Sequence, residues 1–125
     1  IDVPELAQKC GLEPKRWNCG REAAAELIRL ADFGRVTCKE ISRGDRNLIR
    51  GICTVFERNK LPDGTYDSKE ININREMVAR GWALASGAGS DVYIEAEQVA
   101  QKAKKGIWRG AFVPPWEWRA AQTPR

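Results

Sequence analysis

Hydrophobic positions in the first half of the chain follow two different periods. Residues 21–31 repeat apolar side chains at the spacing of one helix face, which predicts a helix that stops before Gly34. The members of this face are Ala24, Leu27, Ile28 and Ala31. Residues 36–41 and 49–56 are rich in β-branched and apolar side chains, which predicts two antiparallel strands joined through residues 42–45. The first half therefore predicts a helix followed by a hairpin.

The second half of the chain carries mainly helical patterns. Residues 57–69 are polar and contain Pro62-Asp63-Gly64, which predicts an exposed turn segment longer than a tight hairpin needs. Residues 73–80 predict a short helix, and residues 90–105 a longer one. The apolar stripe of the longer helix consists of Val92, Ala96, Val99, Ala100 and Ala103. Helices interleaved with a small antiparallel sheet favour the α+β class.

The length and composition of the chain fit one globular domain over residues 1–125. The 125 residues are 42% hydrophobic, which is enough for a core. Charges interrupt the apolar stretches well before the ~18 residues that a membrane span needs, so we expect no transmembrane segment. The sequence has neither an initiator methionine nor a signal peptide, and we expect a mature chain or a fragment of a longer one.

The four cysteines, Cys10, Cys19, Cys38 and Cys53, predict two disulfides. A zinc site is disfavoured because the cysteines are far apart and the chain has no histidine. Of three possible pairings, we favour Cys10 with Cys19, which closes a local loop, and Cys38 with Cys53, which joins neighbouring strands. Disulfides indicate an oxidising compartment, so we expect a periplasmic or secreted protein. The alternative is four reduced thiols in a cytosolic protein.

A series of short motifs occurs in one order along the chain. The motifs are Ile1-Asp2-Val3-Pro4-Glu5, Gln8-Lys9-Cys10, Trp17-Asn18-Cys19-Gly20, Val36-Thr37-Cys38, Asp45-Arg46, Gly51-Ile52-Cys53, and the stretches at residues 74–83, 103–110 and 114–119. In this order they resemble the thermonuclease-like (staphylococcal nuclease-like) family over essentially the whole chain. The chain is identified as an N-terminally truncated member with degenerate motifs.

The resemblance implies a partial OB-fold with a short antiparallel sheet and three helices. In the family three strands precede the Asp-x-Pro-Glu motif, whereas this chain starts at that motif. The first strands of the barrel are therefore expected to be absent. An open hairpin with uncovered edges should recruit a second copy or another chain, so we expect a homo-oligomer.

The resemblance also implies a calcium-dependent phosphodiesterase site. In the family, two aspartates and a backbone carbonyl hold calcium, a glutamate acts on the attacking water, and two arginines stabilise the phosphate. Carried over to this chain, Asp2 and the carbonyl of Val3 would bind the metal, and Glu5 would be the catalytic glutamate. Arg50 would be the second arginine in a shifted register. Calcium is thus a possible cofactor of an incomplete site.

The chain departs from the family pattern inside the matched region. The family motif Asp-Arg-Tyr-Gly-Arg is replaced by residues 45–50, which lack the Tyr-Gly pair, and the run 86–90 lacks the nucleotide-contacting tyrosines. Loss of one fixed charge stabiliser commonly costs about 2.7–4 kcal/mol of transition-state stabilisation, so little catalysis is expected. Alternatively, Asp2 caps a turn and Glu5 pairs with Arg46 or Arg50.

The net charge of +4 is compatible with a polyanionic partner, either nucleic acid or an acidic polysaccharide. The candidate binding residues are Arg46, Lys102, Lys104, Lys105 and Arg109, with Arg119 on the same basic face. The alternative is a solvated helix end, where cations are favoured by the helix dipole.

Two functions follow from these expectations. The favoured one is a catalytically impaired nuclease-like domain of the cell envelope or exterior that binds a polyanion or a protein partner. Some relatives of this type are linked to exopolysaccharide (succinoglycan) biosynthesis, which suggests that role by analogy. The alternative is an active calcium-dependent endonuclease on DNA or RNA.

Overall fold

The computed structural model describes residues 1–86 and 90–122, without the side chains of Arg46 and Ser90. The chain divides into two compact units, the first formed by Ile1–Glu26 and Met77–Arg125 and the second by Leu27–Glu76. In the described part of the chain, four α-helices accompany one antiparallel sheet of three strands. The predicted α+β class is therefore confirmed.

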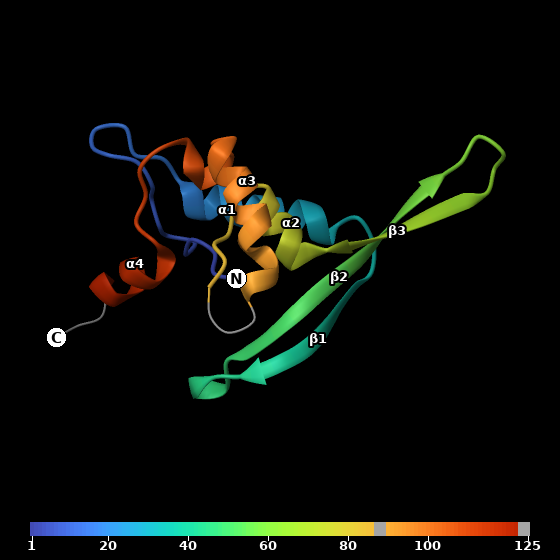
Figure 1. Ribbon diagram of the computed structural model, residues 1–125, viewed down its shortest axis with the longest axis horizontal. Helices are drawn as coiled ribbons and strands as arrows, with labels where there is room; N and C mark the ends of the chain where they lie inside the picture. Colours follow the sequence, from blue (N-terminus) through green and yellow to red (C-terminus); the bar gives the residue numbers. More distant parts are fainter. Residues whose placement is uncertain (87–89, 123–125) are drawn as a thin grey trace. The chain divides into compact units, whose positions relative to one another are not determined.

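The second unit contains the sheet, in the order β1-β2-β3. Its strands are β1 (Val36–Arg43), β2 (Ile49–Lys60) and β3 (Tyr66–Asn72). The first half of β2 pairs with β1 and its second half with β3, and both partners are present only at Thr54 and Val55. Figure 1 shows the two hairpins extending in opposite directions from this overlap. The sheet is thus two hairpins that share one long strand.

The first hairpin is the one that the sequence predicted. The short helical turn η1 (Asp45–Asn47) joins its strands, and a disulfide links Cys38 to Cys53 across them. The side chain of Asn74 accepts a hydrogen bond from the Cys53 amide and donates one to the Gly51 carbonyl, at 3.1 and 3.0 Å. These bonds fix the centre of β2 to the helix that follows the sheet.

The prediction of an extended polar turn at residues 57–69 was wrong. β2 continues to Lys60 and β3 begins at Tyr66, so the turn between them is short. Most side chains of this second hairpin are exposed, so no alternation of buried and polar positions marks its strands. Asp63 accepts hydrogen bonds from the side chain and the amide of Thr65, which stabilise the turn and lower the pKa of Asp63.

The helices lie mainly in the first unit. They are α1 (Cys19–Ala31), α2 (Ile73–Ala79), α3 (Ile94–Lys102) and α4 (Pro115–Gln122), with short 3-10 turns η2 (Ser90–Tyr93) and η3 (Gly106–Arg109). The last residues of α1 and the first of α2 belong to the second unit. The sequence predicted the first three helices but not α4. The predicted apolar face of the first helix was wrong, because Leu27 and Ile28 are exposed and the buried residues of α1 include Ala23, Glu26 and Leu30. None of the described helices combines the length and the apolar character needed to cross a bilayer.

The core of the first unit surrounds a disulfide. Cys10 is bonded to Cys19, and both pack with Leu84 and Ile107. The half-buried aromatic residues against this cluster are Trp17, Trp82, Trp108 and Phe112. Both disulfides thus have the pairing that the sequence favoured.

The buried face of α3 is narrower than the predicted stripe. Ala96 and Ala100 are buried, whereas Val92 and Val99 are exposed. The helix also begins at Ile94 and not at residue 90, because residues 90–93 form a 3-10 turn with a tighter winding. The N-cap residue of α3 is Tyr93, whose side chain makes no capping hydrogen bond.

Candidate functional site

Asp2 is fixed by main-chain pairing with the segment that follows α2. Its amide donates to the Leu84 carbonyl at 2.9 Å, and the Leu84 amide donates back to the Asp2 carbonyl at 2.8 Å. Because Leu84 is buried in the core, the backbone of Asp2 is held rigidly. Its side chain remains 19% exposed.

Glu5 is held by a buried glutamine. The Glu5 amide donates to Oε1 of Gln8 at 3.3 Å, and the Gln8 amide donates to the Glu5 carbonyl at 2.8 Å. The Gln8 carbonyl in turn accepts from the amide of Gly20, near the start of α1. This network places the turn of residues 5–8 and leaves the Glu5 carboxylate 43% exposed.

Arg119 joins the two carboxylates. Its Nη2 donates to Oδ2 of Asp2 at 2.6 Å, and its Nη1 donates to Oδ1 of Asp2 at 3.0 Å and to Oε1 of Glu5 at 2.9 Å. The hydrogen bonds to Asp2 and then to Glu5 raise the pKa of Arg119 above its usual range. Bidentate pairs of this kind are the stronger ion pairs in proteins.

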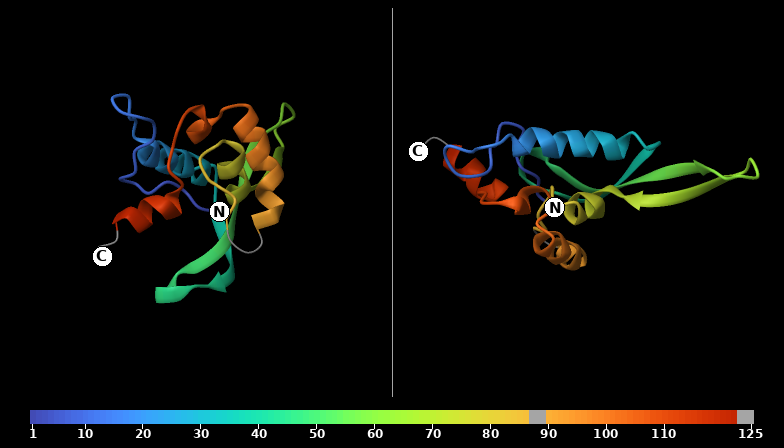
Figure 2. Two further views of the ribbon diagram at one scale, coloured as in Figure 1. Left: turned by 60° about the vertical axis from the view of Figure 1, so that its left-hand side comes forward. Right: turned by 90° about the horizontal axis from the view of Figure 1, so that it is seen from above.

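The C-terminal segment is positioned by the same glutamine that holds Glu5. Nε2 of Gln8 donates to the Val113 carbonyl at 2.7 Å, and Pro115 is buried at the start of α4. Figures 1 and 2 show α4 beside the N-terminal segment, in agreement with the bonds of Arg119. Gln8 therefore aligns both halves of the cluster that comprises Asp2, Glu5 and Arg119.

This arrangement does not fit a calcium ion while Arg119 is bound. Calcium takes six to eight hard oxygen ligands, to which Asp2, Glu5 and the Val3 carbonyl correspond in kind. However, the guanidinium group already binds both carboxylate oxygens of Asp2. Among the described residues, no group of three or more acidic, histidine or cysteine side chains could hold a metal.

The predicted arginines near β2 belong to the second unit. Arg50 is exposed on β2 and pairs in register with Ser42. Arg46 lies in η1, and its side chain is outside the described atoms. Their roles in catalysis or polyanion binding remain predictions. The structure gives Glu5 a different partner from the expected Arg46 or Arg50, namely Arg119.

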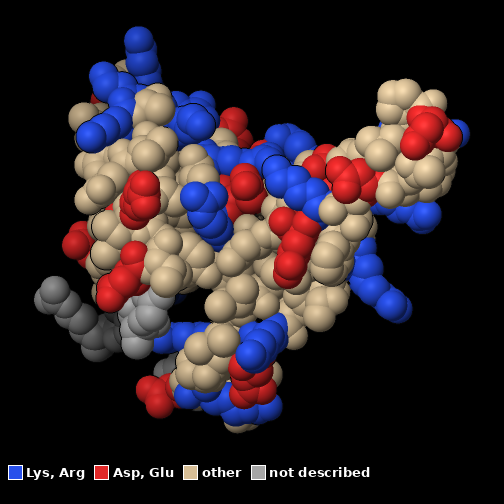
Figure 3. Space-filling model, turned by 45° about the vertical axis from the view of Figure 1, so that its right-hand side comes forward, with Lys and Arg blue, Asp and Glu red and all other residues tan. Residues whose placement is uncertain are grey.

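The basic residues after α3 are largely solvated. Lys102, in the last turn of α3, and the following Lys104 and Lys105 are exposed. Figure 3 shows Lys and Arg side chains gathered at its upper left, over the first unit. Cations at this end of a helix are also stabilised by its dipole, so their presence alone does not identify a ligand.

Arg109 is tied to the surface by aromatic and polar contacts. Its guanidinium lies 3.9 Å from the ring centre of Trp17 and 5.5 Å from that of Trp82. It also donates to the Gly106 carbonyl at 2.9 Å and to Glu22 at 3.4 Å. The side chain is still 48% exposed, so it can contact a ligand without moving.

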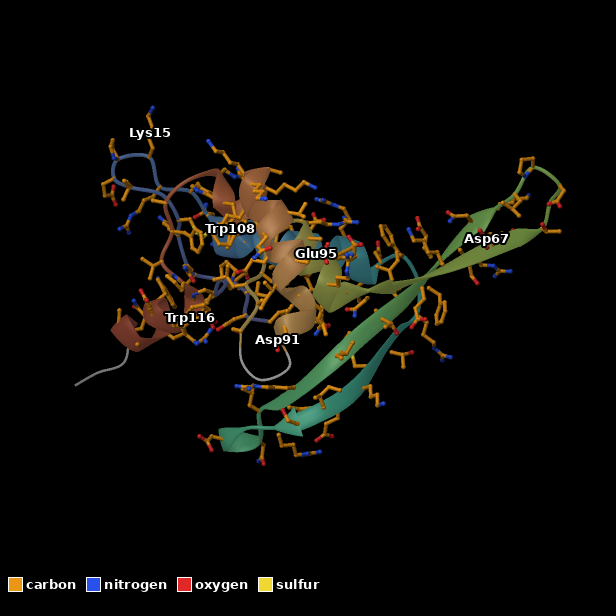
Figure 4. The ribbon with its side chains drawn as sticks, viewed as in Figure 1. Lys15, Asp67, Asp91, Glu95, Trp108 and Trp116 are labelled. Atoms are coloured by element: carbon orange, nitrogen blue, oxygen red, sulfur yellow. A yellow bond between two sulfur atoms is a disulfide. The ribbon has the colours of Figure 1, made fainter. Side chains whose placement is uncertain are left out.

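A shallow pocket of about 470 Å³ adjoins Arg109. It lies between the loop that carries Lys15 and the end of η3, and Leu12 and Trp17 contribute apolar surface to it. Figure 4 shows Lys15 at the outer end of its loop. The pocket therefore combines the aromatic Trp17 with the cationic Lys15 and Arg109 and the acidic Glu13.

The role of Arg119 was not predicted from the sequence, which indicated only that this residue belongs to a basic face. A local signal for α4 exists, because Pro115 is at the first helical position, where proline is favoured. No local signal reveals the partners, since Asp2 and Glu5 are 117 and 114 residues away.

Gln8→Leu should destabilise the first unit by about 2–4 kcal/mol, because it leaves the Glu5 amide and the Val113 carbonyl without their partner. Urea denaturation followed by circular dichroism measures the loss. Gln98→Leu, on the exposed face of α3, is the matched control and should change stability by less than about 0.5 kcal/mol. Equal effects of the two substitutions would contradict the bridging role of Gln8.

The comparisons with known proteins identify one family. A family model described as staphylococcal nuclease homologue matches residues 1–110. No curated protein and no solved structure matches the chain. The matched region contains Asp2, Val3 and Glu5 but ends before α4 and Arg119.

Proposed function

Because the chain belongs to the staphylococcal nuclease homologue family, we propose that it is a nuclease-like domain with a blocked hydrolytic site that binds a polyanion. The observation that carries this proposal is the binding of Arg119 to both Asp2 and Glu5. One internal cation binds both of the carboxylates that the family resemblance assigns to metal binding and water activation.

The block has a direct chemical consequence. A carboxylate oxygen that accepts a hydrogen bond from a guanidinium group has a lone pair engaged by that bond and is a poorer metal ligand than a free one. General-base catalysis requires the carboxylate to reach the water that it deprotonates. In the state that the structure describes, Glu5 shares its Oε1 with Arg119, so we propose that catalysis is impaired in this form.

The ligand that we propose is an anionic polymer, either nucleic acid or an acidic polysaccharide. Lys102, Lys104, Lys105 and Arg109 supply exposed positive charge in one stretch of the first unit. The pocket beside Arg109 adds an aromatic surface on which a base or a sugar ring could stack. A protein partner with an acidic surface is the competing ligand.

The cellular setting of the proposal comes from the two disulfides, which are typical of periplasmic and secreted proteins. An envelope role in exopolysaccharide (succinoglycan) biosynthesis agrees with a polysaccharide ligand and rests on analogy with relatives of this type.

We also propose that the protein is a homo-oligomer. All eight residues of β1 are exposed, and β1 is an edge strand of the sheet. A long exposed edge offers unpaired main-chain groups to another strand. Sedimentation equilibrium of the purified protein measures the assembly state directly.

The second candidate function is an active calcium-dependent phosphodiesterase. It is favoured by the backbone placement of Asp2 and Glu5. The pairing of Asp2 with Leu84 and the hydrogen bonds between Glu5 and Gln8 fix this placement without Arg119. In this case Arg119 would have to leave the carboxylates before catalysis. Asp2 and the Val3 carbonyl would then hold the metal, which would supply Lewis-acid stabilisation of the phosphate, and Glu5 would accept a proton from the attacking water.

One experiment separates the two candidates. The wild type and the Glu5→Gln variant are incubated with single-stranded and duplex DNA, with calcium or with a chelator, and binding to DNA and to an acidic polysaccharide is measured against salt. We expect no calcium-dependent cleavage above that of Glu5→Gln, and binding that weakens steeply as salt rises. Cleavage that requires both calcium and Glu5 would instead establish the phosphodiesterase.

A charge-matched pair of variants locates the binding surface. Replacing Lys102, Lys104 and Lys105 by glutamine should lower the salt dependence of log K by about 3 if each lysine contacts one charge of the polymer. The control replaces Lys39, Lys60 and Lys69, in the second unit, with the same loss of charge. Equal losses in both variants would mean that only net charge matters.

A further inference from the structure

The helix α4 has little packing of its own. Pro115 is buried and Trp118 is half-buried, whereas the other side chains of the helix are exposed, including Trp116, which Figure 4 labels. A helix of eight residues is not stable alone in water, because too few hydrogen bonds offset the cost of nucleation. The order of α4 therefore depends on contacts outside the helix.

Arg119 supplies such contacts at the far end of the helix. Hydrogen bonds from Arg119 reach Asp2 and Glu5, whereas the tie of Gln8 to Val113 and the burial of Pro115 hold the beginning of the segment. The segment is thus held by two kinds of contact, the burial of Pro115 and in part of Trp118, and a charged contact at the surface. Contacts of the second kind weaken with salt and open first.

The charges of the cluster do not cancel. Asp2 and Glu5 carry two negative charges and Arg119 one positive charge, so the three groups sum to −1. The carboxylates hold the guanidinium through charge-assisted hydrogen bonds. A cation that competes for the same oxygens has to displace the end of α4.

We propose that α4 is a latch that Arg119 closes over Asp2 and Glu5, and that local opening of α4 exposes the carboxylate pair to cations in solution. This inference deepens the proposed function, on which it rests, because it makes the block of the site conditional. Opening leaves Gln8 bonded to Val113 and Pro115 buried, so the helix remains tethered and can close again.

Hydrogen exchange of the amides of α4 tests the latch. In Arg119→Gln we expect these amides to exchange about tenfold faster than in the wild type, because the charge-assisted bonds are lost. Arg119→Lys keeps the charge but not the bidentate geometry and should lie between the two. The control Arg16→Gln removes an exposed ion pair to Glu13 in the same unit and should leave α4 unchanged.

Calorimetric titration with terbium, a hard cation that prefers oxygen ligands, provides a second readout without nucleic acid. Arg119→Gln should bind terbium about tenfold more tightly than the wild type. Adding Asp2→Asn to this variant should abolish the gain. Unchanged amide exchange in a folded Arg119→Gln variant, or unchanged terbium affinity, would overturn the latch. Cleavage of DNA by the wild type would contradict the proposed impairment of catalysis, but not the latch.

Discussion

Replacing Gly81 by alanine is expected to destabilise the protein by about 3 kcal/mol or more, from backbone strain and steric overlap together. Gly81 has φ = +81°, a conformation that costs free energy for any residue with a Cβ atom. The added Cβ would also overlap the Lys105 carbonyl oxygen, which belongs to the backbone and cannot move aside independently. Urea denaturation followed by circular dichroism measures the loss.

The matched control is Gly64→Ala. Gly64 has φ = +86°, close to that of Gly81, but no atom lies within 4 Å of the position that its Cβ would take. Its substitution should therefore cost only the conformational strain, about 1 kcal/mol. If the two variants lose equal stability, the close approach of the backbone at Gly81 contributes nothing.

The effect of Gly81→Ala should extend to the carboxylate cluster. The Gly81 carbonyl accepts a hydrogen bond from the Ile107 amide, and Leu84, three residues later, pairs with Asp2. A shift of the backbone at Gly81 is thus transmitted through a short, buried segment to one side of the site. The variant should show faster exchange of the Asp2 and Leu84 amides than Gly64→Ala does.

Removal of the disulfide between Cys10 and Cys19 by alanine substitution should have the second large effect. The chain-entropy model gives about 3 kcal/mol for a loop of this size. Both residues are at most 1% exposed and belong to the core cluster, so the loss of two buried sulfur atoms adds a packing cost. The turn of residues 5–8, which hydrogen-bonds to the start of α1, should loosen as well.

The second disulfide provides the comparison. Cys38→Ala with Cys53→Ala removes a crosslink of sequence separation 15, against 9 for the first pair, so loop entropy alone predicts an equal or larger loss. Cys38 is exposed on β1, and little packing is lost there. Thermal denaturation that shows the larger loss for the Cys38 and Cys53 pair would mean that loop entropy outweighs core packing.

The elements that the sequence predicted well are those rich in apolar or β-branched residues. A helical spacing of apolar residues marks α1, although its buried face contains Ala23, Glu26 and Leu30 and not the predicted Leu27 and Ile28. The β-branched and apolar residues before Phe56 mark the first hairpin, although every residue of β1 is exposed. The second hairpin escaped prediction because it projects with both faces in solvent, so that its strands lack a hydrophobic period. Apolar and β-branched composition thus identified α1 and the first hairpin, whereas the polar composition of residues 57–69 hid the second hairpin.

The candidate site was predictable only in part, for a related reason. The motif at the start of the chain pointed to Asp2 and Glu5, whose local placement depends on neighbouring residues such as Gln8. The decisive partner, Arg119, is near the other end of the chain, and an ion pair imposes no spacing that a sequence pattern could display. The membership of the cluster, and with it the net charge, is therefore visible only in the folded structure.

The two units differ in a way that allows them to be followed separately by fluorescence. All five tryptophans, at positions 17, 82, 108, 116 and 118, belong to the first unit, whereas the second unit carries Tyr66 and no tryptophan. Excitation near the red edge of tryptophan absorption consequently reports on the first unit alone. Comparison of that emission with circular dichroism, to which the sheet contributes, distinguishes a single cooperative transition from two.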